Sequence, residues 1–295
     1  MQSVWVHLNS RVEYTTQVRA CNLDASHYDC PDEIKQEIPS LTRAHLFTAK
    51  IQASVFKLHV YTRPTDVLKG IDQAFQIFHL LLPAAKCAAQ HEWVVEVLWT
   101  RKKKVMPRQK YNPLGRTNAN TGYATKCGSI VVYRKEEWLK TLIHECFHSF
   151  NLDEGLDLSY DFGVPALLSE AFSEVWARII LCCLKSPSFA SVKRNLERER
   201  KFSCAQCAKV LRHNGKTYAD VVRHTMQPYT ENTNIFAYYV LGAVALHMSD
   251  ALVPFETRGF RELLLQGYKS PSFLRCMGEA KPKDLSLRMT RRKLF

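Results

Sequence analysis

Hydrophobic and polar positions alternate in the first part of the chain, a pattern that is typical of β-strands with one face in a core. The stretches Val4 to His7 and Ser54 to Tyr61 alternate in this way. From Pro64 to Ala89 the apolar positions instead follow helical spacing, at Val67, Ile71, Phe75 and Phe78. The pattern therefore predicts strands near the amino terminus, followed by one helix.

Two more strands and a second helix follow in the middle of the chain. Glu92 to Trp99 and Gly128 to Arg134 are rich in β-branched and aromatic residues and predict strands. Lys102 to Tyr123, between them, is polar and interrupted by proline and glycine, so we expect a loop there. A helix is predicted to begin at Lys135, with acidic residues in its first turn and an apolar stripe from Leu139 to Phe150.

Helical spacing prevails in the second half of the chain. The predicted helices cover residues 165–183, 188–201, 217–226, 234–250 and 259–265. The patterns together predict an α+β fold class, with a small mixed β-sheet packed on the helix that begins at Lys135 and a mainly helical C-terminal half. We divide the chain into an N-terminal β-containing region (1–62), a main domain (63–270) and a basic C-terminal tail (271–295).

Composition narrows the class of protein. The 295 residues are 46% hydrophobic, which suffices for one large or two modest domains with buried cores. The amino terminus lacks the basic and apolar segments of a signal peptide. The longest apolar runs, such as Ile179 to Leu184, are far shorter than the about 20 residues of a membrane-spanning helix. We expect a soluble globular protein with no membrane span.

The ten cysteines indicate a reducing compartment. Cys146, Cys182 and Cys183 lie in apolar helical segments, where cysteine acts as a small hydrophobic residue. Reduced thiols are therefore the simplest expectation, and with them an intracellular location such as the cytoplasm. Cys204 and Cys207 form one CxxC pair without a second pair, for which we favour a structural role; His213 nearby keeps a metal or redox role open.

The formal net charge is +13, and it is concentrated in two segments. Arg101 to Lys104 and Lys281 to Lys293 hold much of it, and such clusters attract polyanions or acidic partners. Aromatic residues are not interleaved with these basic runs. We therefore favour a solvated surface and a mobile tail, with binding of nucleic acid or an acidic partner as the alternative.

The stretch TLIHECFHSF contains two histidines four positions apart, with a glutamate after the first. On a helix, His144 and His148 project from one face about 6 Å apart and can reach one metal ion, with Glu145 beside them. A catalytic zinc takes three protein ligands and keeps an open position for water, whose pKa falls to about 7. The alternative is a pair of ordinary core or surface histidines.

Two glutamates compete for the third ligand position. A tight turn at Asn151 could bring Glu154 back to the metal, because Asn tolerates the left-handed conformation and Glu binds zinc; this resembles the metzincin arrangement. Alternatively, Glu170 could be supplied by a second helix. Glu170 and Glu174 are four positions apart in an otherwise apolar helix, where an unpaired carboxylate is costly.

The pairing of HECFH with SEAFSEVWA, in which His144 and Glu170 are 26 positions apart, resembles the thermolysin-type gluzincins. In that family a motif N-E-x-x-S-D follows HExxH at a similar distance. The resemblance implies that His144, His148 and Glu170 bind Zn²⁺ and that Glu145 is the general base. It also implies that Glu174, where the family usually has Asp, orients His144 through its second nitrogen.

The same resemblance places an oxyanion-stabilising tyrosine at Tyr160, between the two ligand motifs. Ser169 stands where the family usually has Asn. No position clearly matches the oxyanion-stabilising histidine. The remaining aromatic candidates, for each of which packing is the alternative, are His224, Tyr229, Tyr238 and Tyr239.

A second resemblance covers Trp93 to Leu246. The segments LWTRKKKVMP, TNANTGYAT, GSIVVYRKEEWLKTLIHECFHSFNLD and ENTNIFAYYVLGAVAL are similar to uncharacterised zincin-like proteins of large DNA viruses. This resemblance implies a zincin-like catalytic domain that acts on a protein or peptide inside an infected cell.

The leading hypothesis is a zinc endopeptidase in which the predicted edge strand Ile130 to Tyr133 aligns an extended substrate by β-pairing. The alternative is a metal-stabilised, catalytically weak protein that binds nucleic acid or an acidic partner through its basic segments. Glu145 favours the enzyme, because a purely structural metal site needs no base. An aminopeptidase would need an anionic pocket for the substrate amine, which the sequence does not identify.

Overall fold

The computed structural model describes residues 1–8, 11–87, 92–282 and 284–291, and their contacts group into two compact units. The first unit comprises residues 1–103 and 121–152, and the second comprises 104–120 and 153–292. The predicted division into 1–62, 63–270 and 271–295 follows chain order, and it stays a prediction.

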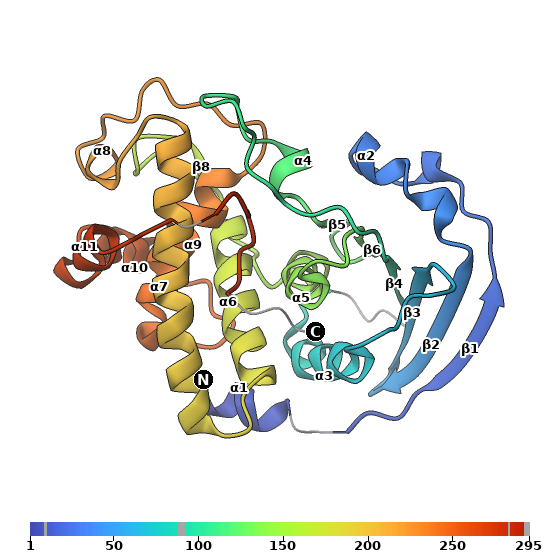
Figure 1. Ribbon diagram of the computed structural model, residues 1–295. Helices are drawn as coiled ribbons and strands as arrows, with labels where there is room; N and C mark the ends of the chain where they lie inside the picture. The colour runs from blue at the N-terminus through green and yellow to red at the C-terminus, as the bar shows by residue number, and fades with distance from the viewer. Residues whose placement is uncertain (9–10, 88–91, 283, 292–295) are drawn as a thin grey trace. The chain divides into compact units, whose positions relative to one another are not determined.

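A six-stranded mixed sheet forms the centre of the first unit (Figure 1). Its strands lie in the order β1-β2-β3-β4-β6-β5. Strands β3, β4 and β6 run parallel, and the other neighbours are antiparallel. The strand bounds are β1 Thr15–Ala20, β2 Arg43–Ile51, β3 Ser54–Thr62, β4 Glu92–Leu98, β5 Gly122–Ala124 and β6 Ile130–Val132.

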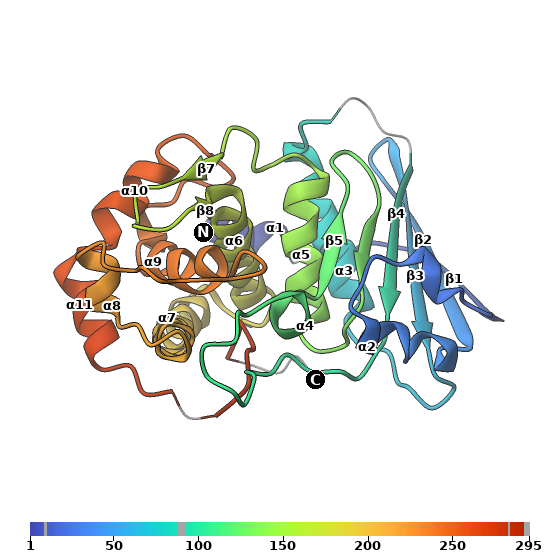
Figure 2. The same cartoon turned by 90° about the horizontal axis from the view of Figure 1, so that it is seen from above.

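Helices α3 (Ile71–Leu81) and α5 (Trp138–Ser149) cover one face of this sheet (Figures 1 and 2). Alternation along β3 turns Phe56 toward α3, where its ring stacks on Phe78 with the centroids 4.6 Å apart. Tyr61 belongs to the opposite face and packs in a buried cluster with Ile34 and Ile38. The short elements of this unit are α1 Gln2–His7, η1 Ala25–His27, α2 Asp32–Lys35, η2 Ile38–Ser40 and η3 Leu82–Ala84.

The predicted strands over Ser54 to Tyr61, Glu92 to Trp99 and Gly128 to Arg134 are confirmed as β3, β4 and β6. The strand predicted over Val4 to His7 is wrong. These residues form helix α1, which packs on α3, and a four-residue alternation is too short to distinguish the two structures. The helix predicted over Pro64 to Ala89 is shorter: α3 begins at Ile71 and ends at Leu81, η3 continues to Ala84, and Ala89 itself lies outside the described residues.

The beginning of α5 and the preceding loop also differ from prediction. α5 begins at Trp138 rather than Lys135, because Glu137 adopts a left-handed conformation with φ 62° at its N-cap. The predicted loop from Lys102 to Tyr123 contains a short helix, α4 (Arg116–Ala119), and the start of β5. Strands as short as β5 give little signal in the sequence.

The second unit is almost entirely helical, which confirms the predicted helical C-terminal half (Figure 2). Helix α7 extends to His213, well past its predicted end at residue 201. A π-helix, η4, opens the segment that was predicted as an α-helix from residue 234. The elements are α4, β7 Leu158–Ser159, β8 Ala166–Leu167, α6 Leu168–Leu184, α7 Phe189–His213, α8 Tyr218–Val222, η4 Phe236–Leu241, α9 Gly242–His247, η5 Ser249–Ala251, α10 Phe260–Gly267 and α11 Pro271–Gly278.

The C-terminal segment is not a mobile solvated tail where the structure describes it, so that prediction is wrong there. Leu287 is fully buried in a cluster with Val210 and Tyr239, and the Tyr239 hydroxyl donates to the Leu287 carbonyl at 2.5 Å. Lys209 of α7 forms an ion pair with Asp284 at 2.9 Å. Lys283 and residues 292–295, which belong to the predicted basic tail, lie outside the described residues.

Four of the ten cysteines form disulfides, Cys87–Cys127 and Cys204–Cys276. The expectation of reduced thiols is therefore wrong for these four. The CxxC pair is not a joint metal or redox site, because Cys204 bonds to Cys276 rather than acting with Cys207. Since disulfides persist in oxidising surroundings, the prediction of a reducing compartment loses its main support.

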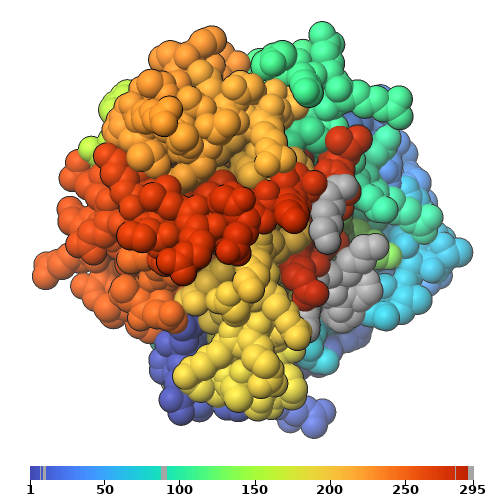
Figure 3. Space-filling view, turned by 60° about the vertical axis from the view of Figure 1, so that its left-hand side comes forward, coloured from blue at the N-terminus to red at the C-terminus, as the bar shows by residue number. Residues whose placement is uncertain are grey.

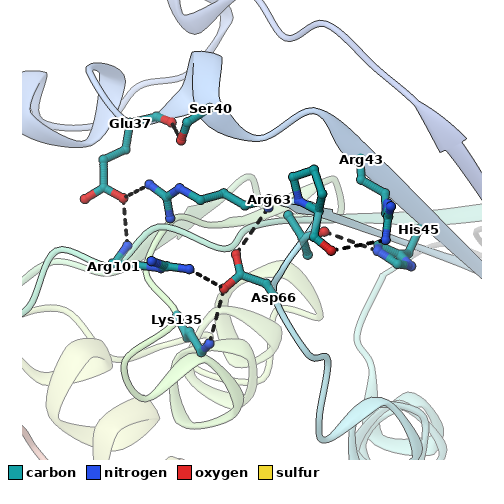
Figure 4. A network of polar contacts seen from close by, with 10 residues as sticks. Glu37, Ser40, Arg43, His45, Arg63, Asp66, Arg101 and Lys135 are labelled. Carbon is teal, nitrogen blue, oxygen red and sulfur yellow. Dashed lines mark hydrogen bonds and ion pairs between the residues drawn. The ribbon is translucent and has the colours of Figure 1, made fainter.

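A network of ion pairs ties together four loops of the first unit (Figure 4). Glu37 accepts from the Arg63 side chain at 2.7 Å and from the Arg101 backbone N–H at 2.9 Å. Asp66, whose side chain is only 3% exposed, pairs with Arg101 at 3.1 Å and Lys135 at 3.6 Å. Lys135 lies three residues before the start of α5, so the network fixes the approach to that helix.

The run Arg101 to Lys104 is therefore not a uniformly solvated basic patch. Arg101 is engaged with Asp66, and Lys104 is fully buried. Lys102 and Lys103 remain exposed. A polyanion would meet three of the four charges on which the prediction of a binding segment rested, and one of these three, on Arg101, is already paired.

The network should make the first unit sensitive to acid. Burial alone would raise the pKa of Glu37 and of Asp66, but hydrogen bonds and ion pairs to Arg101 and Arg63 outweigh it and hold both pKa values below their usual range. Their contribution to stability is present above the unfolded pKa values of about 4 and is lost as pH falls through the lower folded values. Urea unfolding of Glu37→Gln should show lower stability at pH 7 and a flatter decline below pH 5 than the native protein. Glu13→Gln, at an exposed site, is the control; equal acid slopes for all three would contradict the prediction.

Candidate metal centre

Helix α5 holds the two histidines in a geometry that suits one metal ion. Their Nε2 atoms lie 3.1 Å apart, and the ring planes are inclined by 78°. Two nitrogens at 2.0 to 2.1 Å from a tetrahedral zinc are about 3.3 Å apart. This separation is compatible with two ligand positions of zinc, although a hydrogen bond between the two rings accounts for it equally well.

Strand β5 comes unusually close to α5, and a glycine permits it. A Cβ atom at Gly122 would lie 2.6 Å from the Val131 carbonyl, 3.0 Å from Thr141 Cγ2 and 3.2 Å from Glu145 Cγ. No larger residue fits without moving the strand. The absence of a side chain at Gly122 thus places the edge of the sheet directly beside Glu145.

This edge is β5, not the predicted Ile130 to Tyr133, because β6 lies between β4 and β5. The Thr121 carbonyl accepts from the Tyr133 N–H at 2.8 Å. Alternation along an antiparallel strand then turns the backbone groups of Gly122 and Ala124 away from β6; Gly122 is buried and Ala124 is partly exposed. An extended chain could pair with the sheet at Ala124, the more accessible of the two residues.

The second motif lies in α6, where Glu170 occupies the first turn. Asn234 Nδ2 donates to Glu170 Oε1 at 2.9 Å, which fixes one oxygen of that carboxylate. Glu174 is fully buried, and its Oε1 accepts from Arg178 Nε at 2.8 Å. Arg178 also donates to the Ser203 hydroxyl and to the Tyr238 carbonyl. The helix thus presents two carboxylates that are each held by a specific partner.

His144, His148 and Glu170 form a group that could bind a metal ion: each offers one ligand atom, and these atoms lie within 4.8 Å of one another. Asn151 does adopt the left-handed conformation that the alternative arrangement requires, with φ 56°. However, Glu154 is exposed and is not a member of the group.

The predicted oxyanion residues have varied surroundings. Tyr160 is 71% exposed in the connection between β7 and β8, and its role stays a prediction. The Tyr229 hydroxyl donates to Glu231 at 2.7 Å, and His224 Nε2 lies 3.3 Å from the Tyr268 hydroxyl. Tyr239 binds the C-terminal segment. These contacts are typical of packing roles.

Sequence reasoning missed Asn234 and Glu231. Burial raises the pKa of Glu231 to about 7, against the opposing hydrogen bonds from Tyr229 and from the Phe236 N–H. The Phe236 N–H is the first of the π-helix η4, so Glu231 caps that element. Both residues belong to the segment ENTN, whose polar composition alone indicates a loop.

Comparison with known proteins adds little. No protein-family model and no curated protein matches the chain. A solved structure of an aminopeptidase N family protein from Idiomarina loihiensis is similar over 90% of this chain, at 10% identity and a TM-score of 0.39. The chain spans 49% of that protein's length. A similarity this low carries no argument about function, which depends here on the geometry of the site.

Among the described residues, no helix combines the length and the apolar character that crossing a membrane requires. The resemblance to proteins of large DNA viruses, and an infected cell as the location, stay predictions from the sequence.

Proposed function

We propose that the protein is a zinc-dependent metallopeptidase of the gluzincin type with a zincin-like fold. The observation that supports this most directly is the group of His144, His148 and Glu170. Two imidazoles and one carboxylate are a donor set of catalytic zinc sites, which leave a fourth position open. A structural zinc site would be closed by a fourth protein ligand.

The chemistry follows from the residues around this donor set. Zinc bound there would supply an electrophile and a water with a pKa of about 7. Glu145, which is 7% exposed, takes a proton from water and passes it to the leaving amine as the peptide bond breaks. The open edge of β5 beside Glu145 pairs with the backbone of an extended protein or peptide substrate.

Two further residues support these steps. Glu174, held at Oε1 by Arg178, is assigned the role that the sequence predicts for it, which is to orient a zinc-ligating histidine through the second ring nitrogen. Tyr160 donates its hydroxyl to the developing oxyanion. The alternative function is a catalytically weak protein that binds nucleic acid or an acidic partner. It leaves Glu145 without a role. It also relied on a mobile basic tail, whereas the C-terminal segment is packed where the structure describes it.

Removal of metal tests the proposal. The purified protein should contain about one equivalent of zinc and hydrolyse a quenched-fluorescent peptide library. Phenanthroline should abolish the hydrolysis, and added zinc should restore it. A protein without bound zinc, or hydrolysis that resists the chelator, would exclude a zinc peptidase.

A further inference from the structure

A hollow of about 790 Å³ opens on the second unit, lined by α7, α11, the end of α9 and the C-terminal segment. In Figure 3 this segment, in red, crosses the yellow and orange surface of α7. Of the described residues that line the hollow, seven are cationic and four are anionic, which gives these residues a net formal charge of +3. They are Arg198, Arg200, Lys201, Lys209, Arg275, Lys281 and Arg291, with Glu197, Asp250, Glu279 and Asp284.

Three of the anionic residues are matched inside the hollow. Arg200 pairs with Asp250 at 2.9 Å, and Lys209 pairs with Asp284 at 2.9 Å. Lys201 pairs with Glu197 at 3.7 Å.

The excess charge therefore lies on four other side chains, opposed only by Glu279. In the described part of the chain these four are exposed and form no ion pair: Arg198, Arg275, Lys281 and Arg291.

The walls of the hollow are fixed before any ligand arrives. The Cys204–Cys276 disulfide joins α7 to α11. The buried side chain of Gln206 donates to the Ser286 carbonyl at 3.2 Å, and Lys209 donates to the same carbonyl at 2.7 Å. Because helices and segment are already held together, a ligand has little ordering to induce.

We propose that this hollow binds a small anion that carries several phosphate groups. Three of the four unmatched side chains are arginines, whose planar guanidinium binds phosphate through paired hydrogen bonds. The volume is that of a small-molecule site, within the usual range of about 300 to 1,000 Å³. Among the described residues, Phe202 is the only phenyl, tyrosyl or indole ring in the lining, so this part of the hollow lacks the stacking platform of single-stranded nucleic acid sites. The site is independent of the proposed peptidase centre.

Titration calorimetry of the full chain with inorganic tripolyphosphate tests the proposal. The double variant R198E/R275E should weaken binding at least about tenfold, since it removes charge-assisted hydrogen bonds. The matched control is K193E/R194E, which changes the net charge equally on exposed positions of the same helix outside the hollow. It should change affinity by less than about twofold, the residual effect of distant screened charges.

Lys281→Glu provides a second variant in case the double variant folds poorly, and it should also weaken tripolyphosphate binding. Absence of binding to the native protein, or equal weakening by both double variants, would overturn the proposal. If a polyglutamate peptide or a single-stranded oligonucleotide bound more tightly than tripolyphosphate, the proposal would also be overturned, and the ligand would be a macromolecule.

Discussion

Replacing Glu145 by glutamine should abolish peptide hydrolysis while zinc content and fold stay unchanged. Gln keeps the size of the side chain beside β5 but cannot accept a proton from water. General bases accelerate reactions by a factor of about 10² to 10⁴, so kcat should fall by a factor of at least about 10². Hydrolysis of the best library peptide, zinc analysis and thermal unfolding of the same preparations measure the three properties together.

Glu136→Gln, shortly before α5 and only partly buried, is the matched control and should retain full rate. A loss of less than about tenfold for Glu145→Gln would contradict a general-base role. Loss of zinc in that variant would instead indicate that Glu145 supports the metal site, and the rate could then say nothing about proton transfer.

The motif helix was predictable because its signal is local. The apolar stripe from Leu139 to Phe150 and the spacing of the two histidines both depend on a single helical period. The strands β3 and β4 are long and rich in β-branched residues, so their sequence pattern was also sufficient to predict them. Local periodicity therefore located the elements on which the proposed ligands lie.

Features that depend on distant pairing escaped prediction. β5 consists of three residues in a polar segment, and no periodicity marks so short a strand. Because Gly122 has no side chain, this segment can approach Val131 and Glu145 and form the edge of the sheet. Disulfide connectivity cannot be deduced from spacing alone, and Cys204 pairs with Cys276 rather than with its near neighbour Cys207. In each case the partner is set by the three-dimensional arrangement.

The C-terminal segment has a basic sequence, yet part of it is packed in a core. Its basic residues predicted a solvated tail, whereas Leu287 and Met289 are buried in the core. Two apolar residues in a basic context carry no periodic signal. Asn234 was missed for a similar reason, since its target Glu170 lies 64 positions away.

Glu170→Ala should lose both zinc and activity, whereas Glu154→Ala should keep both. Glu170 is only partly exposed in a helix of mostly apolar, buried residues, where a cation or strong hydrogen bonds stabilise a carboxylate. Glu154 is exposed, and water already solvates its charge. The two single variants remove the same chemical group, so their zinc affinities, measured by competition with a chelating dye, compare the two sites directly.

Asn234→Ala makes the comparison quantitative. It leaves Glu170 in place but removes the 2.9 Å hydrogen bond to Oε1, and loss of such an outer partner typically costs about 10- to 100-fold in metal affinity. Zinc affinity should therefore decrease from the native protein to Asn234→Ala and further to Glu170→Ala. If Glu154→Ala were the variant that lost zinc, the turn at Asn151 with its φ of 56° would deliver the third ligand. The gluzincin assignment would then give way to a divergent metzincin.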